Sequence, residues 1–178
     1  MYLKPKNQRV IVLIDAQNFY HSAKNLYRKK VNFGEVLKVA IQGRKLIRAF
    51  AYVVKTKTGE ERPFLEALNK LGIETRVREL QEFYGGQKKA DWDVGIVIDA
   101  IRCAQNVDVI VLCSGDGDFI PLVDYLKNQG KRVEVIAFGK TTSSKLKEVA
   151  DEFIDLSKDP KRFLLPQGTR VKIKYGKS

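Results

Sequence analysis

The stretch Asp108–Phe119, Asp-Val-Ile-Val-Leu-Cys-Ser-Gly-Asp-Gly-Asp-Phe, constrains the fold more than any other part of the sequence. Residues 109–113 form an unbroken apolar run rich in β-branched side chains, which is typical of a strand buried on both faces of a parallel sheet. The run ends at Ser114, and Asp116 and Asp118 follow in one short loop. Because ligands bind at the carboxyl ends of strands in open α/β sheets, the stretch predicts two carboxylates at a ligand-binding edge.

These two carboxylates allow two interpretations. Unit charges ~4 Å apart repel by roughly 4 kcal/mol at an effective dielectric of about 20. A divalent cation removes that repulsion, and hard Mg²⁺ or Mn²⁺ prefers carboxylate oxygen. The alternative is a helix N-cap, because Asp is a favoured cap and Gly117 suits a tight turn. The loop alone does not decide between a metal site and a cap.

The rest of the chain indicates one α/β domain, because 178 residues suffice for one core and apolar strand segments alternate with helical spacing. The expected strands are Val10–Ile14, Leu46–Val54, Ile73–Leu80 at a sheet edge, Val109–Cys113, Val133–Phe138 and Phe153–Ile154. The expected helices are Phe19–Tyr27, Asn32–Ile41, Pro63–Leu71, Val94–Gln105, Phe119–Asn128 and Thr142–Ala150. This order predicts a three-layer α/β/α sandwich with a mostly parallel, Rossmann-like central sheet.

The end of the chain differs in composition from the rest. After Asp159 there are six Lys or Arg and no acid, together with Pro160, Pro166 and Gly168. We therefore expect residues 1–157 to form the domain and residues 158–178 to form a basic tail with a weak strand-like patch at Val171–Lys174. Residues 81–89 are expected to form a flexible basic loop.

Charge and composition narrow the classes of function. The chain has 33 basic and 21 acidic residues, a net charge of +12, which favours nucleic acid as a partner; a protein that is merely basic is the alternative. No apolar run approaches the ~20 residues of a membrane span, so no membrane association is expected. With Cys103, Cys113 and His21 as the only cysteines and histidine, neither a zinc cluster nor a disulfide framework is expected, and we predict a cytoplasmic protein.

Further carboxylates come from two other places in the chain. Asp15 directly follows the first strand, so it would lie next to the Asp116 loop at a topological switch point. Asp93 and Asp99 belong to the helix before the central strand, although Asp99 could also be a solvent-facing residue. Such a cluster within a basic protein suits metal-dependent cleavage of a phosphate backbone, because cations bind the scissile phosphate and Lys or Arg bind the flanking ones.

Three motifs resemble those of one family. They are Val-Leu-Ile-Asp15-Ala-Gln-Asn18, Trp-Asp93-Val-Gly-Ile-Val-Ile-Asp99-Ala and Ser114-Gly-Asp116-Gly-Asp118-Phe119. In this order they resemble the NYN domains of the PIN-like nuclease superfamily, within the LabA-like subgroup. The resemblance covers roughly residues 10–156. It departs from the family pattern at Ala16, where many members carry Gly, and at Lys88-Lys89-Ala90, where a Lys-Gly pair is frequent.

This resemblance implies a PIN-like fold and a metal-dependent ribonuclease. The residues expected to take part in catalysis are Asp15, Asn18, Asp93, Asp99, Asp116 and Asp118. The expected ligands of Mg²⁺ or Mn²⁺ are Asp15, Asp93, Asp116 and Asp118, and no organic cofactor is expected. From the residues alone, Asp15, Asp116 and Asp118 would be the principal ligands, with Asp93 and Asp99 placing a second ion or the attacking water.

The expected partner is single-stranded RNA. Four basic residues, Arg44, Lys45, Lys88 and Lys89, are expected to contact its phosphates. Tyr84 and Trp92 could stack on RNA bases, although Trp92 fits the core equally well. His21 is interpreted as an ordinary surface or core histidine rather than as a catalytic base. The alternatives are an RNA-binding module without turnover and, less favoured, a metal-dependent phosphatase, since position 17 is Gln where an Asp-x-Asp motif needs Asp. A homodimer is left open.

Overall fold

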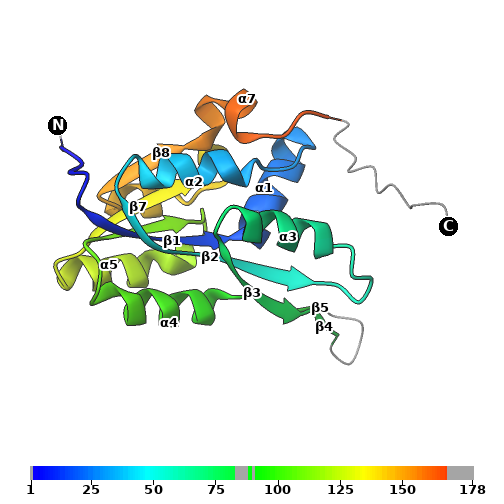
Figure 1. Ribbon diagram of the computed structural model, residues 1–178, viewed down its shortest axis with the longest axis horizontal. Helices are drawn as coiled ribbons and strands as arrows, with labels where there is room; N and C mark the ends of the chain where they lie inside the picture. The colour runs from blue at the N-terminus through cyan, green and yellow to red at the C-terminus, as the bar shows by residue number, and fades with distance from the viewer. Residues whose placement is uncertain (1, 83–87, 90, 168–178) are drawn as a thin grey trace.

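The computed structural model describes residues 2–82, 88–89 and 91–167. Within them a six-stranded parallel sheet has the order β3-β2-β1-β6-β7-β8 (Figure 1). Its strands are β1 (Arg9–Asp15), β2 (Lys45–Lys55), β3 (Glu74–Glu79), β6 (Val109–Cys113), β7 (Arg132–Ala137) and β8 (Glu152–Asp155). The α-helices are α1 (Ala16–Tyr27), α2 (Phe33–Ile41), α3 (Arg62–Lys70), α4 (Asp93–Ala104), α5 (Ile120–Asn128), α6 (Ser144–Val149) and α7 (Pro160–Phe163).

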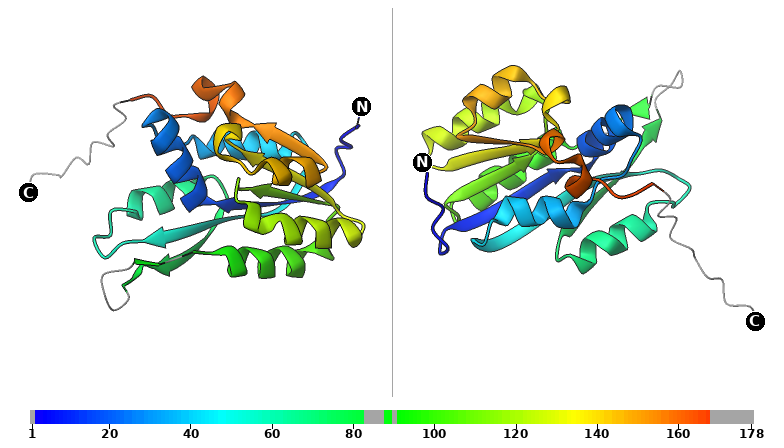
Figure 2. Two further views of the ribbon diagram at one scale, coloured as in Figure 1. Left: turned by 180° about the vertical axis from the view of Figure 1, so that it is seen from behind. Right: turned by 90° about the horizontal axis from the view of Figure 1, so that it is seen from above.

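Helices cover both faces of this sheet (Figures 1 and 2). Along β1, the side chains of Val10, Val12 and Ile14 face a core made with α1, α2, α3 and α7. The alternate residues Ile11 and Leu13 face a second core made with α4, α5 and α6. Burial on both faces explains the continuous apolar runs in the sequence. The predicted three-layer sandwich and its parallel sheet are confirmed.

The chain reverses its direction of travel across the sheet between β1 and β6. It adds β2 and then β3 on one side of β1, crosses back through α4, and adds β6, β7 and β8 on the other side. Ile14 pairs with Cys113 at the ends of the two central strands. The loops after β1 and β6 therefore meet at the topological switch point, which is where ligands bind in open sheets of this kind. This confirms the predicted neighbourhood of Asp15 and the Asp116 loop.

Two short strands lie outside the main sheet. β4 (Gln81–Glu82) pairs antiparallel with β5 (Lys88–Lys89), in the segment expected to be a loop. Tyr84 lies outside the described residues. In the described part of the chain, no helix combines the length and the apolar character that a membrane crossing requires.

The folded body continues beyond residue 157. Phe163 and Leu164 are buried in the core, and Leu164 forms a β-bridge with Val31. The Leu165 N–H donates a hydrogen bond to the Lys30 carbonyl, with an N···O distance of 2.8 Å. Residues 158–165 thus pack on the domain rather than beginning a free tail, and the predicted patch at Val171–Lys174 lies outside the described residues.

Arg44 belongs to the interior, which corrects its assignment as an RNA contact. Its guanidinium forms a two-pronged ion pair with the Glu134 carboxylate, at 2.8 and 3.0 Å, and both side chains are fully buried. It also donates to the carbonyls of Ala40 and Ile41 at the end of α2. Because a buried acid inside strand β7 needs a counter-charge, Arg44 serves the core and cannot reach a phosphate.

We predict that Arg44→Ala lowers the free energy of unfolding by about 3–5 kcal/mol, because it removes the principal partner of the buried Glu134 carboxylate. Urea denaturation measures this change. The matched control is Arg62→Ala, which removes an exposed pair with Glu66 and should cost less than about 1 kcal/mol. Equal losses in the two variants would contradict a core role for Arg44.

Candidate metal centre

Hydrogen bonds join the loops that follow β1 and β6. The Asp15 carboxylate accepts the Asn18 N–H at 3.1 Å and the Ser114 hydroxyl at 3.0 Å. The Asn18 side-chain oxygen in turn accepts the Gly115 N–H at 3.0 Å. Asp15 therefore caps α1 and at the same time holds the neighbouring loop. The role of Ser114 was not predicted, although its position directly after a buried strand was the available signal.

The β6 loop presents two carboxylates through a tight local turn. Asp116 accepts the N–H of Asp118 at 2.9 Å and caps the short 3₁₀ helix Gly117–Phe119, which leads into α5. Gly115 allows a close approach, because a methyl group there would lie 2.7 Å from the Thr142 hydroxyl oxygen. Asp116 therefore caps the short helix and also belongs to the carboxylate cluster. The two interpretations of the sequence, a helix N-cap and a metal site, do not exclude each other.

Asp93 is held in place by its neighbour Trp92 at the start of α4. The Trp92 indole N–H donates to the Val53 carbonyl at 3.1 Å, and its ring packs against Tyr52. The Arg78 guanidinium covers the Trp92 ring, 4.5 Å from its centroid. The indole is thus an anchor for the helix start rather than a free platform for bases. Arg78 was not singled out from the sequence, because only the fold brings β3 beside Trp92.

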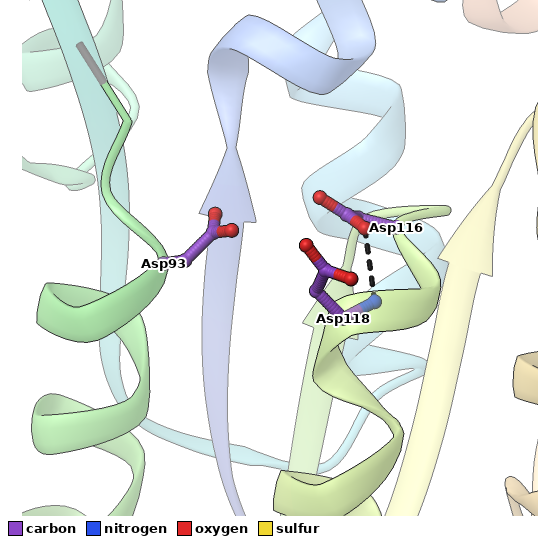
Figure 3. A group of neighbouring side chains, drawn as sticks. All are labelled: Asp93, Asp116 and Asp118. Carbon is purple, nitrogen blue, oxygen red and sulfur yellow. Dashed lines mark hydrogen bonds between the residues drawn. The ribbon is translucent and has the colours of Figure 1, made fainter. Parts of the chain in front are cut away.

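Asp93, Asp116 and Asp118 converge in front of the tip of β1 (Figure 3). One carboxylate oxygen from each residue lies within 4.8 Å of the other two. Asp118 is exposed and the other two are half-buried. Among the described residues, no Lys or Arg pairs with these carboxylates. Three unneutralised carboxylates of this kind suit a hard divalent cation.

The electrostatics of the site reflect this excess of negative charge. Burial, followed by the charges of Asp116, Asp91 and Asp15, raises the pKa of Asp93 to about 6. Burial also raises the pKa of Asp15, although its hydrogen bonds from Asn18 and Ser114 oppose the rise. In both groups, burial disfavours the ionised form of the carboxyl group.

Asp99 lies outside this cluster, which corrects its predicted role. Its carboxylate accepts the Tyr52 hydroxyl at 2.8 Å and a two-pronged contact from Arg76 at 2.9 and 3.2 Å. Asp99 follows Asp93 by six residues, which is about 240° around a helix of 3.6 residues per turn. The two side chains therefore leave α4 in different directions, and Asp99 neutralises Arg76 instead.

Lys45, another predicted RNA contact, lies apart from the cluster. Lys45 is exposed at the start of β2, where it pairs in register with Arg9, so it lies at the opposite edge of the sheet from Asp15. At ~3.3 Å per residue, the two edges are about 20 Å apart. His21 is exposed on α1, with its ring against Tyr20. The backbones of Lys88 and Lys89 form β5, and their predicted contacts with RNA stay a prediction.

The fold and the site define a class, a parallel α/β sandwich with a carboxylate cluster at its switch point. Residues 9–157 match the family model of the NYN domain, and the chain belongs to the NYN domain family. This membership confirms the family resemblance found in the three motifs.

Individual relatives agree with this assignment. The Low amplitude and bright protein LabA from Synechococcus elongatus is 29% identical over 160 residues, covering 84% of each chain, which supports the LabA-like subgroup. The uncharacterized protein MJ0482 from Methanocaldococcus jannaschii is 25% identical over 158 residues, covering 85% of this chain and 56% of that one. The crystal structure of VPA0982, a protein of unknown function from Vibrio parahaemolyticus, superposes with a TM-score of 0.82 at 32% identity, covering 92% of this chain and all of that one.

We predict that Asp93→Asn stabilises the protein in EDTA at neutral pH, because it removes a half-buried charge that its neighbours repel. After allowance for solvent screening, the gain should be on the order of 1 kcal/mol, or about 2–4 °C in Tm. The raised pKa means that Asp93 is protonated in the folded protein below about pH 6, so the gain should shrink as the pH falls from 6 toward 4. Thermal melts at several pH values measure it, and a lower Tm for the variant at neutral pH would contradict the repulsion.

Proposed function

We propose that the chain is a metal-dependent ribonuclease that hydrolyses phosphodiester bonds of single-stranded RNA. The observation that carries the proposal is the convergence of Asp93, Asp116 and Asp118 from two separate elements. Membership of the NYN family supports a nuclease-type function, and the net charge of +12 supports a polyanionic substrate.

The residues fit a divalent cation of the Mg²⁺ or Mn²⁺ type. Asp93, Asp116 and Asp118 would hold it, and Asp15 would contribute directly or through water from the tip of β1. When bound, such a cation neutralises the cluster, lowers the pKa of a bound water and offsets charge on the leaving oxygen. The chain itself fixes the β6 loop through Ser114 and Asn18, so that the carboxylates do not have to be ordered on binding.

Side-chain nucleophiles are poorly supported in the described residues. Ser114 is fully buried and donates its hydroxyl hydrogen to Asp15. Burial raises the pKa of the thiols of Cys103 and Cys113, so neither is an activated thiolate. Water is therefore the attacking group that this proposal uses.

The main alternative is an RNA-binding module of the same fold that does not turn over its ligand. A module without catalytic demand could lose any of the acids, whereas this chain keeps the cluster and Asp15. A metal-dependent phosphatase is less favoured, because Gln17 stands where a second aspartate would be needed. Single-stranded specificity, a homodimer and a cytoplasmic location stay predictions.

We predict that Asp116→Asn weakens Mn²⁺ binding at least about tenfold, a change of roughly 1.4 kcal/mol, because it keeps the shape of the side chain and removes its charge. Isothermal titration calorimetry measures the affinity. Asp124→Asn is the matched control, since Asp124 is exposed on α5, and it should leave the affinity unchanged. Unchanged Mn²⁺ affinity in Asp116→Asn would remove this residue from the metal site.

We predict that cleavage of a labelled single-stranded RNA needs Mn²⁺ or Mg²⁺, stops in EDTA, and leaves a 5′-phosphate and a 3′-hydroxyl. Direct attack by water makes the 2′-hydroxyl unnecessary, so an all-2′-deoxy strand should also be cut if it binds. Mass spectrometry of the products identifies their ends. Products with 2′,3′-cyclic phosphates would show that the 2′-hydroxyl is the nucleophile, and RNA that is bound but never cut would favour the binding module.

A further inference from the structure

The segment that follows Asp15 carries only positive charge. From Ala16 to Gly34 the sequence has no acidic residue, whereas Lys24, Arg28, Lys29 and Lys30 are basic. All four are exposed. Within the described residues none of the four pairs with a carboxylate, so this group keeps its full charge. Exposed lysines for which no ion pair is found also occur elsewhere in the described residues, as at Lys6 and Lys70, but here four basic residues fall within seven positions of sequence.

Helix α1 runs from the tip of β1, next to the metal centre, to this charge. Asp15 caps the helix, which leaves the tip of β1 and remains at the carboxyl edge of the sheet (Figure 2). Tyr20 and Lys24 are four residues apart, so they lie on one face of α1, and Arg28 is the C-cap that follows its last turn. The helix itself starts at Asp15, whose charge acts on Asp93, and Lys29 and Lys30 follow its C-cap.

An exposed aromatic ring lies between the cluster and the basic residues. Tyr20 is 52% exposed, and its ring is flanked by His21 and by the Lys24 ammonium, which lies 5.6 Å from the ring centroid. Tyr20, Lys24, Asn25 and residues 28–30 also line one shallow, open hollow. Open grooves that combine cations with exposed rings are typical of surfaces that bind single-stranded nucleic acid, where phosphates meet the cations and bases stack on the rings.

We propose that this α1 track, defined as Tyr20, Lys24, Arg28, Lys29 and Lys30, binds the RNA strand on one side of the scissile phosphate. The inference rests on the proposed ribonuclease function and adds the path of its substrate. The basic residues contact phosphates, and Tyr20 stacks on a base close to the metal centre. Twelve residues of helix span ~18 Å, which is about five nucleotides at the ~3.4 Å rise of a stacked strand.

Part of this charge also has a structural use. Cations near a helix C-terminus stabilise it by ~0.3–1 kcal/mol through the helix dipole, which applies to Arg28 and its two neighbours. That effect also reaches Lys24, which lies in the last turn of α1, but it does not account for the exposure of Tyr20. A stability measurement therefore has to accompany the binding experiment, so that the two roles of these cations are separated.

The experiment compares two triple variants in the binding of a fluorescein-labelled oligouridylate of about twelve nucleotides. Lys24→Gln, Lys29→Gln and Lys30→Gln remove charge from the α1 track and leave Arg28, whose φ of 53° suits few replacements. Lys6→Gln, Lys70→Gln and Arg102→Gln remove the same charge from exposed positions away from the α1 track. Fluorescence anisotropy is recorded in EDTA at several salt concentrations, so binding is measured without cleavage, and thermal melts check folding.

Each phosphate contact on a single strand contributes about −0.7 to the slope of log affinity against log salt. The α1-track variant should therefore flatten the slope by about 2. Between about 50 and 200 mM salt, its affinity should then fall by roughly twentyfold less than that of the unchanged protein. The control variant should keep the slope of the unchanged protein. Tyr20→Ala should weaken binding at least about fivefold without changing the slope, because it removes stacking and no charge.

Equal slopes for the two triple variants, or binding of anionic lipid vesicles with no binding of RNA, would overturn the α1 track. These outcomes are separate from the fate of the proposed function. RNA cleavage with an unchanged slope in the α1-track variant would contradict the track alone. A flattened slope in a protein that never cleaves RNA would support the track and contradict the ribonuclease proposal.

Discussion

The contact between the carboxyl ends of β1 and β6 is the constraint on which the site depends. These strands are neighbours in the sheet although about 100 residues separate them, and Ser114 and Gly115 donate hydrogen bonds to Asp15 and Asn18 across the gap. Because both strands are buried on both faces, their register cannot slip without exposing apolar side chains. The loop that carries Asp116 and Asp118 is thereby fixed relative to Asp15.

The distribution of charge follows from the same arrangement. Away from the cluster, buried ionic groups are matched: Glu134 with Arg44, and Asp99 with Arg76. At the switch point, Asp93, Asp116 and Asp118 have no such partner in the described part of the chain. Unmatched carboxylates cost stability in the free protein, and a cation would offset this cost. The mutual repulsion of these carboxylates is therefore located at the carboxyl edge of the sheet, where ligands bind in folds of this kind.

The sequence was sufficient for the fold and for most of the cluster, because both depend on short-range patterns. Unbroken apolar runs identified the buried strands, and a carboxylate at the end of such a run marked the carboxyl edge. Asp93 could be predicted because it lies at the start of the helix that precedes the central strand. Asp99 could have been excluded from the sequence alone, because a residue six positions further along a helix does not lie on the same face.

The errors concern partners that only the fold brings together. Arg44 reads as a surface cation until β7 places Glu134 beside it, although an acid within an otherwise apolar strand was a signal that a buried partner exists. Phe163 and Leu164 read as part of a basic tail, because their docking site involves Val31, more than 130 residues earlier. The α1 track was missed because Tyr20, Lys24 and Arg28 are separated by ordinary helical spacing, which predicts a solvated face equally well.

The central claim is that the three converging carboxylates hold a divalent cation, and a crystal structure of the protein grown with Mn²⁺ tests it most directly. Anomalous scattering locates Mn²⁺ independently of any assumption about the site. The prediction is a peak within bonding distance of one oxygen each from Asp93, Asp116 and Asp118, in front of the tip of β1. A peak bound elsewhere, or no peak at this position in crystals saturated with Mn²⁺, would contradict it.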